Sequence, residues 1–514
     1  MALLKKGLLF SLLSMMIIAC TEDTVDFTLT INTIGNGSVS QEKLDDKTIR
    51  LTAVPEENHK FINWSGDLTG TANPTEIILD QNKSITVNFD VDDLLEIRVS
   101  EGGSYEKEIV SSENGVLVYE LRAITASGYA FVSWSNSENE YYTPTLTLEI
   151  EKETLLSLDF VDTSLPFEYN KSSIVNLDNE IIWGLDAINN DHLIFTTKSG
   201  KIYSFKDNQS TVISSHYEDV VNSSGQGGLL DIKLDPNYEL NKYVYVTYSE
   251  KISGSNFSYL ALDRFKYEND QISSVESIFK TSTPSQRNGH FGSRIGFSNE
   301  YLFLSIGEGS PSIGGANSPR QNAQDLTNDW GKIHRLNYDG SIPADNPFYN
   351  SGNSRKTIYS YGHRNPQGLL FDPYSLSVIS TEHGPKGGDE LNVIKKGLNY
   401  GWPLVSYGIN YDGSDISGRN HEGYEKPVFY WDPSIATSHL IFLKDRSHNS
   451  WFKNILVAGL KSKSIFRLKS ENGVYQQVEK ISLGYRVRSI CEGESGVFFV
   501  SNDNGGIIKF TPIE

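Results

Sequence analysis

Short runs of β-branched and aromatic residues, separated by turns rich in Gly, Asn and Asp, fill residues 168–514. Examples are DHLIFTTKSGKIYSF, NKYVYVTYSE and GVFFVSNDNGGIIKF. Long amphipathic helical patterns are scarce here, so the region predicts an all-β domain, either a sandwich, a barrel or a propeller. At about 40–60 residues per four-stranded blade, its length favours a six-bladed β-propeller.

Two earlier stretches, residues 27–92 and 94–162, look like copies of one small β unit. Each contains an aromatic residue, two intervening residues, a Trp and a Ser, running from Phe61 to Ser65 and from Phe131 to Ser135. Each continues with a polar loop, an alternating strand and a closing strand that ends in Phe. The pattern resembles the divergent InlB-type B-repeat of bacterial surface proteins. Such repeats are usually spacers or interaction modules.

The first twenty residues, MALLKKGLLFSLLSMMIIAC, combine two lysines with an apolar run too short to span a bilayer. The IIAC junction resembles the lipobox of bacterial lipoproteins. By that resemblance, residues 1–19 are a signal peptide and Cys20 is the lipidated mature N-terminus, which anchors the protein in the outer membrane, facing the periplasm or the cell surface. The alternative is a plain signal peptide with an incidental Cys. Only Cys491 would remain, so no intrachain disulfide is expected.

The charge balance excludes some partners. With 45 Lys+Arg against 65 Asp+Glu, the net charge is −20. A nucleic-acid-binding protein needs a basic face, so no nucleic-acid partner is expected. The same balance argues against adhesion to anionic lipid by charge. Within this acidic chain, GYRVRS places Arg486 and Arg488 two residues apart, on one face of a strand. They either form ion pairs with acidic residues or bind an anion.

Other polar residues of the large region stand at predicted strand ends or loop starts, where a propeller opens at its axis. Each has an ordinary structural explanation: a lone His is usually a hydrogen-bonded residue, and Gly-Pro is usually a turn. Together, however, they occur in a recognisable order: Gln226, His290, Glu308, Arg364, Asn365, Gly384, Pro385, Glu390, Tyr400, Lys461, Arg486 and Arg488.

The motifs GHRNPQG, EHGPKGGDELN and NYGWPLVSYGINYDG carry a family resemblance. Residues 168–514 resemble the soluble glucose/sorbosone dehydrogenases that depend on pyrroloquinoline quinone (PQQ), and are nearest to their aldose sugar dehydrogenase branch. The resemblance implies a six-bladed β-propeller, in agreement with the strand pattern. It also implies a sugar substrate, PQQ and Ca²⁺ as cofactors, and an external electron acceptor.

The resemblance also assigns roles. His290 matches the general base that removes the anomeric hydroxyl proton, and Glu308 matches the acid that orients it. Four residues match contacts to the quinone oxygens: Gln226, Arg364, Asn365 and Lys461. Arg486 and Arg488 match the arginines that hold the PQQ carboxylates. Gly384 and Pro385 match carbonyl ligands of the Ca²⁺ that polarises PQQ, and Glu390 and Tyr400 match part of a second, structural calcium site.

These observations predict an enzyme that oxidises an aldose at C1 to the lactone, with hydride passing to PQQ and then to an external acceptor. The alternative is a surface propeller that binds carbohydrate or protein without redox chemistry, because one fold can host many functions. The presence of a His, a Lys and two Arg in family order favours the enzyme.

Overall fold

The computed structural model describes residues 27–113, 116–285, 287–309, 319–416, 421–471 and 473–513. The predicted signal peptide and Cys20 lie outside these residues. Strands dominate the described chain, and the prediction of an all-β protein is confirmed. The helical elements are single turns: α1 (Tyr238–Asn241), η1 (His216–Asp219), η2 (Pro319–Ala323) and η3 (Arg446–Trp451). None of the described helices is long and apolar enough to cross a membrane.

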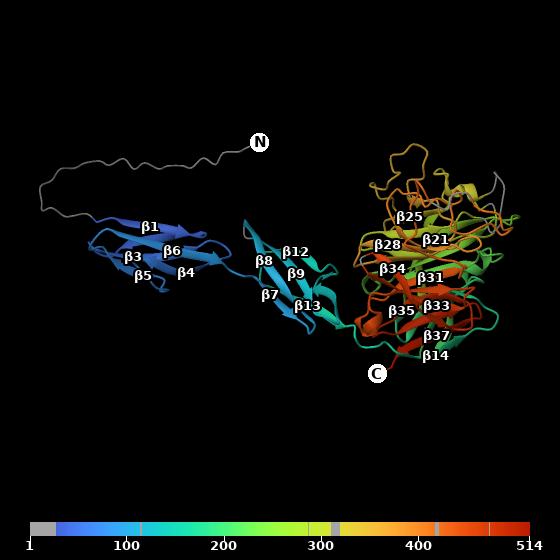
Figure 1. The fold of residues 1–514 in the computed structure, drawn as a ribbon, viewed down its shortest axis with the longest axis horizontal. Coiled ribbons are helices and arrows are strands. Elements are labelled where there is room, and N and C mark those ends of the chain that lie inside the picture. The colour runs from blue at the N-terminus through green and yellow to red at the C-terminus, as the bar shows by residue number, and fades with distance from the viewer. Residues whose placement is uncertain are drawn as a thin grey trace. The chain divides into compact units, whose positions relative to one another are not determined.

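The first predicted module consists of two three-stranded sheets (Figure 1). One has the order β1 (Leu29–Ile34), β6 (Lys83–Val91) and β4 (His59–Gly66), with β1 parallel to β6. The other has the order β2 (Gly37–Lys43), β3 (Thr48–Pro55) and β5 (Thr75–Ile78). Leu51, Ile85 and Val87 pack around the buried Trp64, so inward-facing residues of both sheets form one core.

The second module has a comparable pair of sheets. The orders are β11 (Glu140–Tyr141), β10 (Tyr129–Ser135), β13 (Thr154–Asp162), β7 (Leu95–Val99), and β12 (Thr145–Ile150), β9 (Val116–Thr125), β8 (Gly103–Glu113). The register shifts between Phe131 and Ser133 in β10, as it does between Phe61 and Asn63 in β4. The two copies therefore place a β-bulge at the same point before the Trp. Strands β10 and β11 belong to the same compact unit as residues 157–514, which include most of β13.

Among the described residues after Phe167, the strands form six four-stranded sheets, each a meander of antiparallel neighbours. Five are consecutive in the chain: β15 (Ile182–Asn189), β16 (His192–Thr197), β17 (Ile202–Lys206), β18 (Gln209–Ser214); β19 (Leu229–Leu234), β20 (Tyr243–Lys251), β21 (Ser258–Glu268), β22 (Gln271–Lys280); β23 (Ile295–Phe297), β24 (Leu302–Ile306), β25 (Lys332–Leu336), β26 (Ile358–Tyr361); β27 (Pro366–Asp372), β28 (Ser377–Glu382), β29 (Asp389–Ile394), β30 (Phe429–Trp431); β31 (Thr437–Phe442), β32 (Ile455–Gly459), β33 (Ser464–Glu471), β34 (Val474–Ser482).

The sixth sheet joins the two ends of this region. Its order is β14 (Tyr169–Asn176), β37 (Gly506–Pro512), β36 (Phe498–Asn502) and β35 (Val487–Glu492), so a strand from the start of the region pairs with the last strand of the chain (Figure 1). The first strands of consecutive sheets are in contact, and β35 is in contact with β15. The six sheets therefore close into a ring whose inner strands are β15, β19, β23, β27, β31 and β35.

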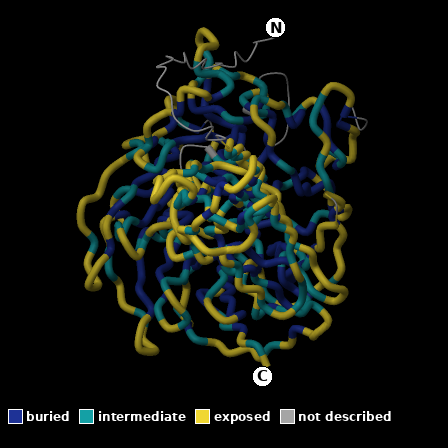
Figure 2. Tube along the Cα trace, turned by 90° about the vertical axis from the view of Figure 1, so that its left-hand side faces the viewer, coloured by how far each residue is buried: buried dark blue, intermediate teal, exposed yellow. Residues whose placement is uncertain are grey.

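Apolar side chains fill the space between neighbouring sheets. Leu193 and Phe195 of β16 pack with Phe499 of β36, and Leu456 of β32 packs with Val500 of the same strand. Residues of the inner strands are mostly buried, and in Figure 2 many of the exposed residues lie along the outer edge of the trace. Burial between sheets holds the ring together, which leaves the loops at its axis free to carry polar groups.

Candidate functional site

Four of the predicted site residues stand just before inner strands of the ring. Gln226 precedes β19, His290 precedes β23, Asn365 precedes β27 and Arg486 precedes β35. The same ends of the inner strands therefore meet around the axis. This arrangement brings together residues that lie up to 260 positions apart, because each sheet contributes one short loop at the same place.

These loops enclose a cavity of about 380 Å³. It is lined by Ile181, Trp183, Lys198, Gly225, Gln226, His290, Arg364, Asn365, Gln367, His383, Tyr411, Ala436, Leu460, Arg486, Arg488 and Asp503. Six of the predicted cofactor and catalytic residues thus line one cavity, and Glu308 lies directly behind His290.

The imidazole of His290 is held at one ring nitrogen by a carboxyl group, and its other nitrogen is free. Its Nδ1 is 2.8 Å from Oε1 of Glu308, whose side chain is buried. In the tautomer that donates from Nδ1 to Glu308, Nε2 keeps its lone pair, and it has no hydrogen-bond partner among the described residues. Burial, and secondarily Arg364, holds the pKa of His290 well below its usual value. The imidazole is therefore neutral, as a proton acceptor must be.

The backbone around His290 is constrained as well. His290 has a φ of +50°, a left-handed conformation that is uncommon for a residue with a side chain. Its N–H donates to Oε1 of Gln226 at 2.9 Å, and the N–H of Gly292 donates to Oδ1 of Asn365 at 3.1 Å. Both predicted cofactor amides therefore also fix the loop that presents the histidine.

Arg486 and Arg488 do form ion pairs with an acidic residue. Nε of Arg486 is 2.7 Å from Oδ2 of Asp503, and Nε of Arg488 is 2.9 Å from its Oδ1. Burial acts to raise the pKa of Asp503, but the two arginines outweigh it and lower the pKa. One carboxylate cannot neutralise two guanidinium groups, so this pair retains one positive charge in excess.

The whole cavity has an excess of positive charge. Among the described lining residues, four cationic side chains (Lys198, Arg364, Arg486 and Arg488) accompany a single carboxylate, that of Asp503. The Nε of Arg364 is buried and has no partner. A concentrated positive charge in a protein of net charge −20 is the electrostatic signature of an anion site. A tricarboxylate such as PQQ matches this donor set, because guanidinium forks bind carboxylates.

Lys461 is the predicted quinone contact that the structure does not bring into the lining. Its side chain is exposed, whereas its neighbour Leu460 does line the cavity. The backbone N–H of Lys461 donates to the carbonyl of Ile435 at 3.0 Å. This places the residue at the rim of the cavity.

The predicted ligands of the polarising calcium lie next to the cavity. Gly384 and Pro385 directly follow His383, which lines it, and the N–H of Gly384 donates to Oδ1 of Asp389 at 2.9 Å. Among the described residues, no N–H or side chain donates to either carbonyl oxygen of Gly384 or Pro385. Two backbone carbonyls without donors fit a hard cation, for which carbonyl oxygen is a suitable ligand.

The predicted second calcium site contains two adjacent buried carboxylates. Glu382 and Glu390 face each other across β28 and β29, and the amide of Asn392 donates to both, at 3.0 and 3.1 Å. Burial and the neighbouring Glu382 raise the pKa of Glu390 well above its usual range. Tyr400 donates its hydroxyl to the carbonyl of Val393, so only its backbone is free for a ligand role. Among the described residues, no group of three or more His, Cys, Asp or Glu side chains is arranged so that it could hold a metal ion, so a cation here would need carbonyl oxygens too.

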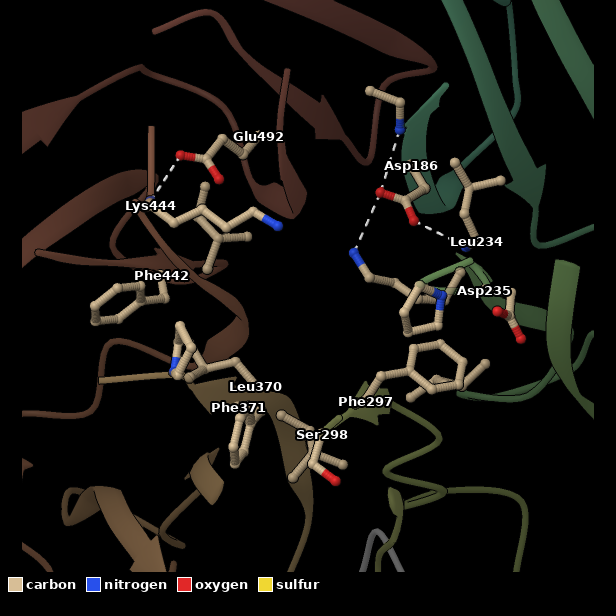
Figure 3. Close-up of a pocket in the computed structure, with 18 of the residues that line it drawn as sticks. Asp186, Leu234, Asp235, Phe297, Ser298, Leu370, Phe371, Phe442, Lys444 and Glu492 are labelled. Atoms are coloured by element: carbon tan, nitrogen blue, oxygen red, sulfur yellow. Dashed lines mark hydrogen bonds and ion pairs between the residues drawn. The ribbon is translucent and has the colours of Figure 1, made fainter. Parts of the chain in front are cut away.

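A second cavity, of about 710 Å³, lies at the opposite ends of the inner strands (Figure 3). Its wall combines apolar and charged side chains, among them Asp186, Lys233, Phe297, Phe371, Phe442 and Glu492. Lys233 is paired with Asp186 at 3.2 Å. No residue lines both cavities, and the positive excess and the free His290 nitrogen belong to the smaller one.

Sequence reasoning missed several residues of the smaller cavity, among them Asp503, His383, Trp183 and Lys198. Asp503 sits in a Gly/Asn turn after β36, and its pairing with the arginines depends on the register of β35 against β36. His383 could have been noted, because it directly precedes the Gly384–Pro385 motif. Trp183 begins an inner strand and reads as an ordinary core residue.

Comparisons with known proteins match two separate parts of the chain. A family model described as Glucose / Sorbosone dehydrogenase matches residues 179–509, and one described as Divergent InlB B-repeat domain matches residues 27–93. Aldose sugar dehydrogenase YliI of Escherichia coli is 32% identical over 340 residues, which are 64% of this chain and 90% of that protein. Quinoprotein glucose dehydrogenase B of Acinetobacter calcoaceticus is 30% identical over 277 residues, 48% of this chain and 57% of that protein. The crystal structure of the soluble aldose sugar dehydrogenase of Escherichia coli, in the apo-form, is 31% identical with a TM-score of 0.62, covering 67% of this chain and 100% of that one.

Proposed function

Because the chain belongs to the glucose/sorbosone dehydrogenase family, we propose that it oxidises an aldose at C1 to the lactone with PQQ as cofactor. The observation that carries this proposal is the positively charged cavity in which a neutral histidine keeps one nitrogen free. The names of the quinoprotein and aldose dehydrogenase relatives support the same activity. We further propose that the six sheets are the six blades of a propeller, with this cavity at one end of its axis.

Each residue of the cavity has a task in this reaction. PQQ would supply the hydride acceptor. Arg486, Arg488 and Lys198 would hold its carboxylates, and the orphaned Nε of Arg364 offers a donor to a quinone oxygen. His290 Nε2 would take the proton from the C1 hydroxyl as hydride leaves the same carbon. Glu308 would keep the imidazole in the tautomer that leaves Nε2 free, and would stabilise the imidazolium that forms.

Asp503 has to share its arginines with the incoming carboxylates. The carboxylate lies between two guanidinium groups that the cofactor would also use. Because Arg presents five N–H donors, each arginine can keep one bond to Asp503 and direct others to the ligand. Asp503 thereby fixes the orientation of both forks before the cofactor binds. Lys461, exposed at the rim, remains a predicted contact.

We propose Ca²⁺ as the second cofactor, held in part by the carbonyls of Gly384 and Pro385. The absence of donors to these two oxygens supports it. A second cation beside Glu390 and the backbone of Tyr400 would relieve the repulsion between Glu382 and Glu390. We also propose that the protein is an exported lipoprotein acylated at Cys20. It would pass the electrons to an external acceptor. Labelled fatty acid should enter the wild-type protein and not Cys20→Ala.

The deciding experiment is reconstitution of the purified apo-protein. Dye-linked oxidation of aldoses should require both PQQ and Ca²⁺, and chelation should abolish it until Ca²⁺ is restored. A folded protein that binds PQQ without oxidising any sugar of a broad panel would favour the non-catalytic binding propeller. A folded protein that fails to bind PQQ would overturn the enzyme proposal.

A further inference from the structure

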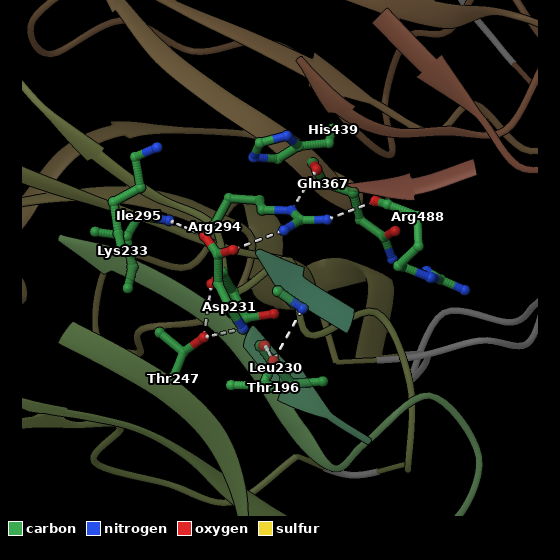
Figure 4. A network of polar contacts seen from close by, with 12 residues as sticks. Thr196, Leu230, Asp231, Lys233, Thr247, Arg294, Ile295, Gln367, His439 and Arg488 are labelled. Carbon is green, nitrogen blue, oxygen red and sulfur yellow. Dashed lines mark hydrogen bonds and ion pairs between the residues drawn. The ribbon is translucent and has the colours of Figure 1, made fainter. Parts of the chain in front are cut away.

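One buried arginine, Arg294, contacts the inner strand of every sheet described in the ring. Figure 4 shows it with Asp231, Gln367 and Arg488. Arg294 directly precedes β23, and its side chain is 0% exposed. Its Nη1 is 2.7 Å from Oδ1 of Asp231 in β19, whose Oδ2 accepts the N–H of Ile295. Its guanidinium carbon is 4.0 Å from the ring centroid of Trp183 in β15.

The remaining N–H groups of Arg294 donate to backbone carbonyls. Nε donates to the carbonyl of Gln367 in β27 at 3.0 Å, and Nη2 donates to that of Ser438 in β31 at 2.7 Å. Nη2 also donates to the carbonyl of Arg488 in β35, at 2.9 Å. This use of a planar fork requires arginine, because a lysine ammonium cannot reach carbonyls on both sides.

Arg294 lies between the two cavities. Three of its contacts, Trp183, Gln367 and Arg488, line the smaller cavity, in which we place the cofactor. Its chain neighbour Ile295 lines the larger cavity on the other side, as does His439, whose pKa is lowered by burial and by Arg294. Among the described residues none lines both cavities, and Arg294 lines neither, so it supports the lining of the smaller cavity from behind.

The arginine remains charged in this position. Burial lowers its pKa to about 10, although Asp231 acts to raise it. Arg294 and Asp231 form a neutral buried pair, so the arginine adds little net charge to the cavity above. Its influence on the cavity therefore acts through the position of Arg488 and Trp183.

We propose that Arg294 is a positioning residue of the PQQ site: it fixes the backbone of Arg488 and the ring of Trp183 from below, so that the Arg488 guanidinium is pre-oriented for a cofactor carboxylate. The proposal rests on the proposed function. It differs from a purely structural role, because it links Arg294 to cofactor affinity as well as to folding.

The test is a PQQ titration of apo-protein, followed by absorbance and intrinsic fluorescence, together with thermal unfolding. Arg294→Met is combined with Asp231→Asn, so that no buried carboxylate is left without a partner. Loss of an oriented charge-assisted contact should raise the PQQ dissociation constant by about ten- to a hundredfold. Arg294→Lys, which keeps the charge but loses carbonyl contacts, should be intermediate.

Arg335→Met is the matched control. Arg335 is also a buried arginine packed on aromatic rings, with Nε 2.6 Å from Oδ1 of Asn346, yet it lines neither cavity. It should lower the unfolding temperature without changing PQQ affinity. An equal loss of affinity in Arg335→Met, or affinity in the folded double variant within about threefold of wild type, would overturn the proposal.

The remaining outcomes of the experiment also test the proposal. If the double variant does not fold, Arg294→Lys gives the answer: wild-type affinity in that variant overturns the proposal. If the wild-type apo-protein itself binds no PQQ, the proposed function fails first and the role of Arg294 fails with it. The two failures are distinguishable: if only the role of Arg294 is wrong, the wild-type protein still binds PQQ, whereas if the proposed function is wrong, it does not.

Discussion

Two buried histidine–carboxylate pairs occur close together in the ring, and only one can act as a base. Nδ1 of His290 is 2.8 Å from Oε1 of Glu308, and Nδ1 of His363 is 3.2 Å from Oε1 of Glu382. In the first pair His290 lines the cavity, and its Nε2 has no hydrogen-bond partner in the part of the chain that the structure describes. In the second, Nε2 is 2.9 Å from the hydroxyl of Ser360, and the ring stacks on Tyr400.

The comparison shows that the pair alone does not determine the chemistry. Both histidines are oriented by a carboxylate, as a general base needs. His363 is 0% exposed, and both of its nitrogens are engaged, so it can only hold structure. His290 has the same partner type but opens onto a cationic cavity. Whether such a histidine can act as a base therefore depends on whether one ring nitrogen is free and whether the residue lines a cavity.

The largest effect should come from His290→Ala. Removal of a general base costs about 10²- to 10⁴-fold in rate, so turnover at saturating PQQ should fall by at least that range. PQQ affinity should change little, since His290 is assigned to proton removal. The measurement is a PQQ titration followed by steady-state kinetics. Turnover close to wild type would remove His290 from the mechanism.

Glu308→Gln should have the next largest effect. The amide keeps the shape but can donate to Nδ1, which would place the imidazole proton on Nε2 and block it. A hydrogen bond to a charged group is worth about 1.5–3 kcal/mol, which corresponds to about a ten- to hundredfold loss of turnover. Glu308→Asp should retain more activity than the amide. An equal loss in Glu308→Asp and Glu308→Gln would point to packing instead of tautomer control.

The pH dependence of kcat/KM should report the titration of His290 and not that of His363. In the proposed mechanism His290 is the neutral base, and burial together with Arg364 lowers its pKa. As pH falls, the active form therefore persists through about 6.5, the ordinary value, and is lost only when pH passes the lowered pKa. The acid limb of kcat/KM, obtained from the dependence of rate on sugar concentration in buffers of different pH, should lie below that point. An inflection at or above 6.5 that disappears in a different His variant would assign the base elsewhere.

The strand pattern was enough to predict the all-β class, because alternation and turn residues are local signals. The resemblance put His290 and Arg488 on one list, and the ring of inner strands brings both to one cavity. Asp503 escaped prediction because its pairing depends on strand register. The exposed position of Lys461 could not be predicted either, because it depends on the conformation of the loop at the rim of the cavity, which the sequence does not specify. Arg294 reads as an ordinary residue of a strand start, and only the closure of the ring shows its contacts.

The smallest effect on turnover should come from His363→Gln. Glutamine cannot satisfy both Glu382 and Ser360 from the same position, so a buried polar group would be left without a partner. That costs about 1–3 kcal/mol in the free energy of unfolding. Turnover per molecule of bound PQQ should stay at the wild-type level, because neither nitrogen of His363 faces the cavity. The measurements are denaturant unfolding and single-turnover kinetics on the same sample.

The His363 pair is linked to the cofactor site through Glu382: the N–H of the neighbouring Arg364 donates to Oε2 of Glu382 at 2.8 Å. A shift of Glu382 would therefore reach the cofactor site through Arg364 and appear as weaker PQQ binding at unchanged turnover. A fall in turnover at saturating PQQ would instead mean that the two histidine pairs act together.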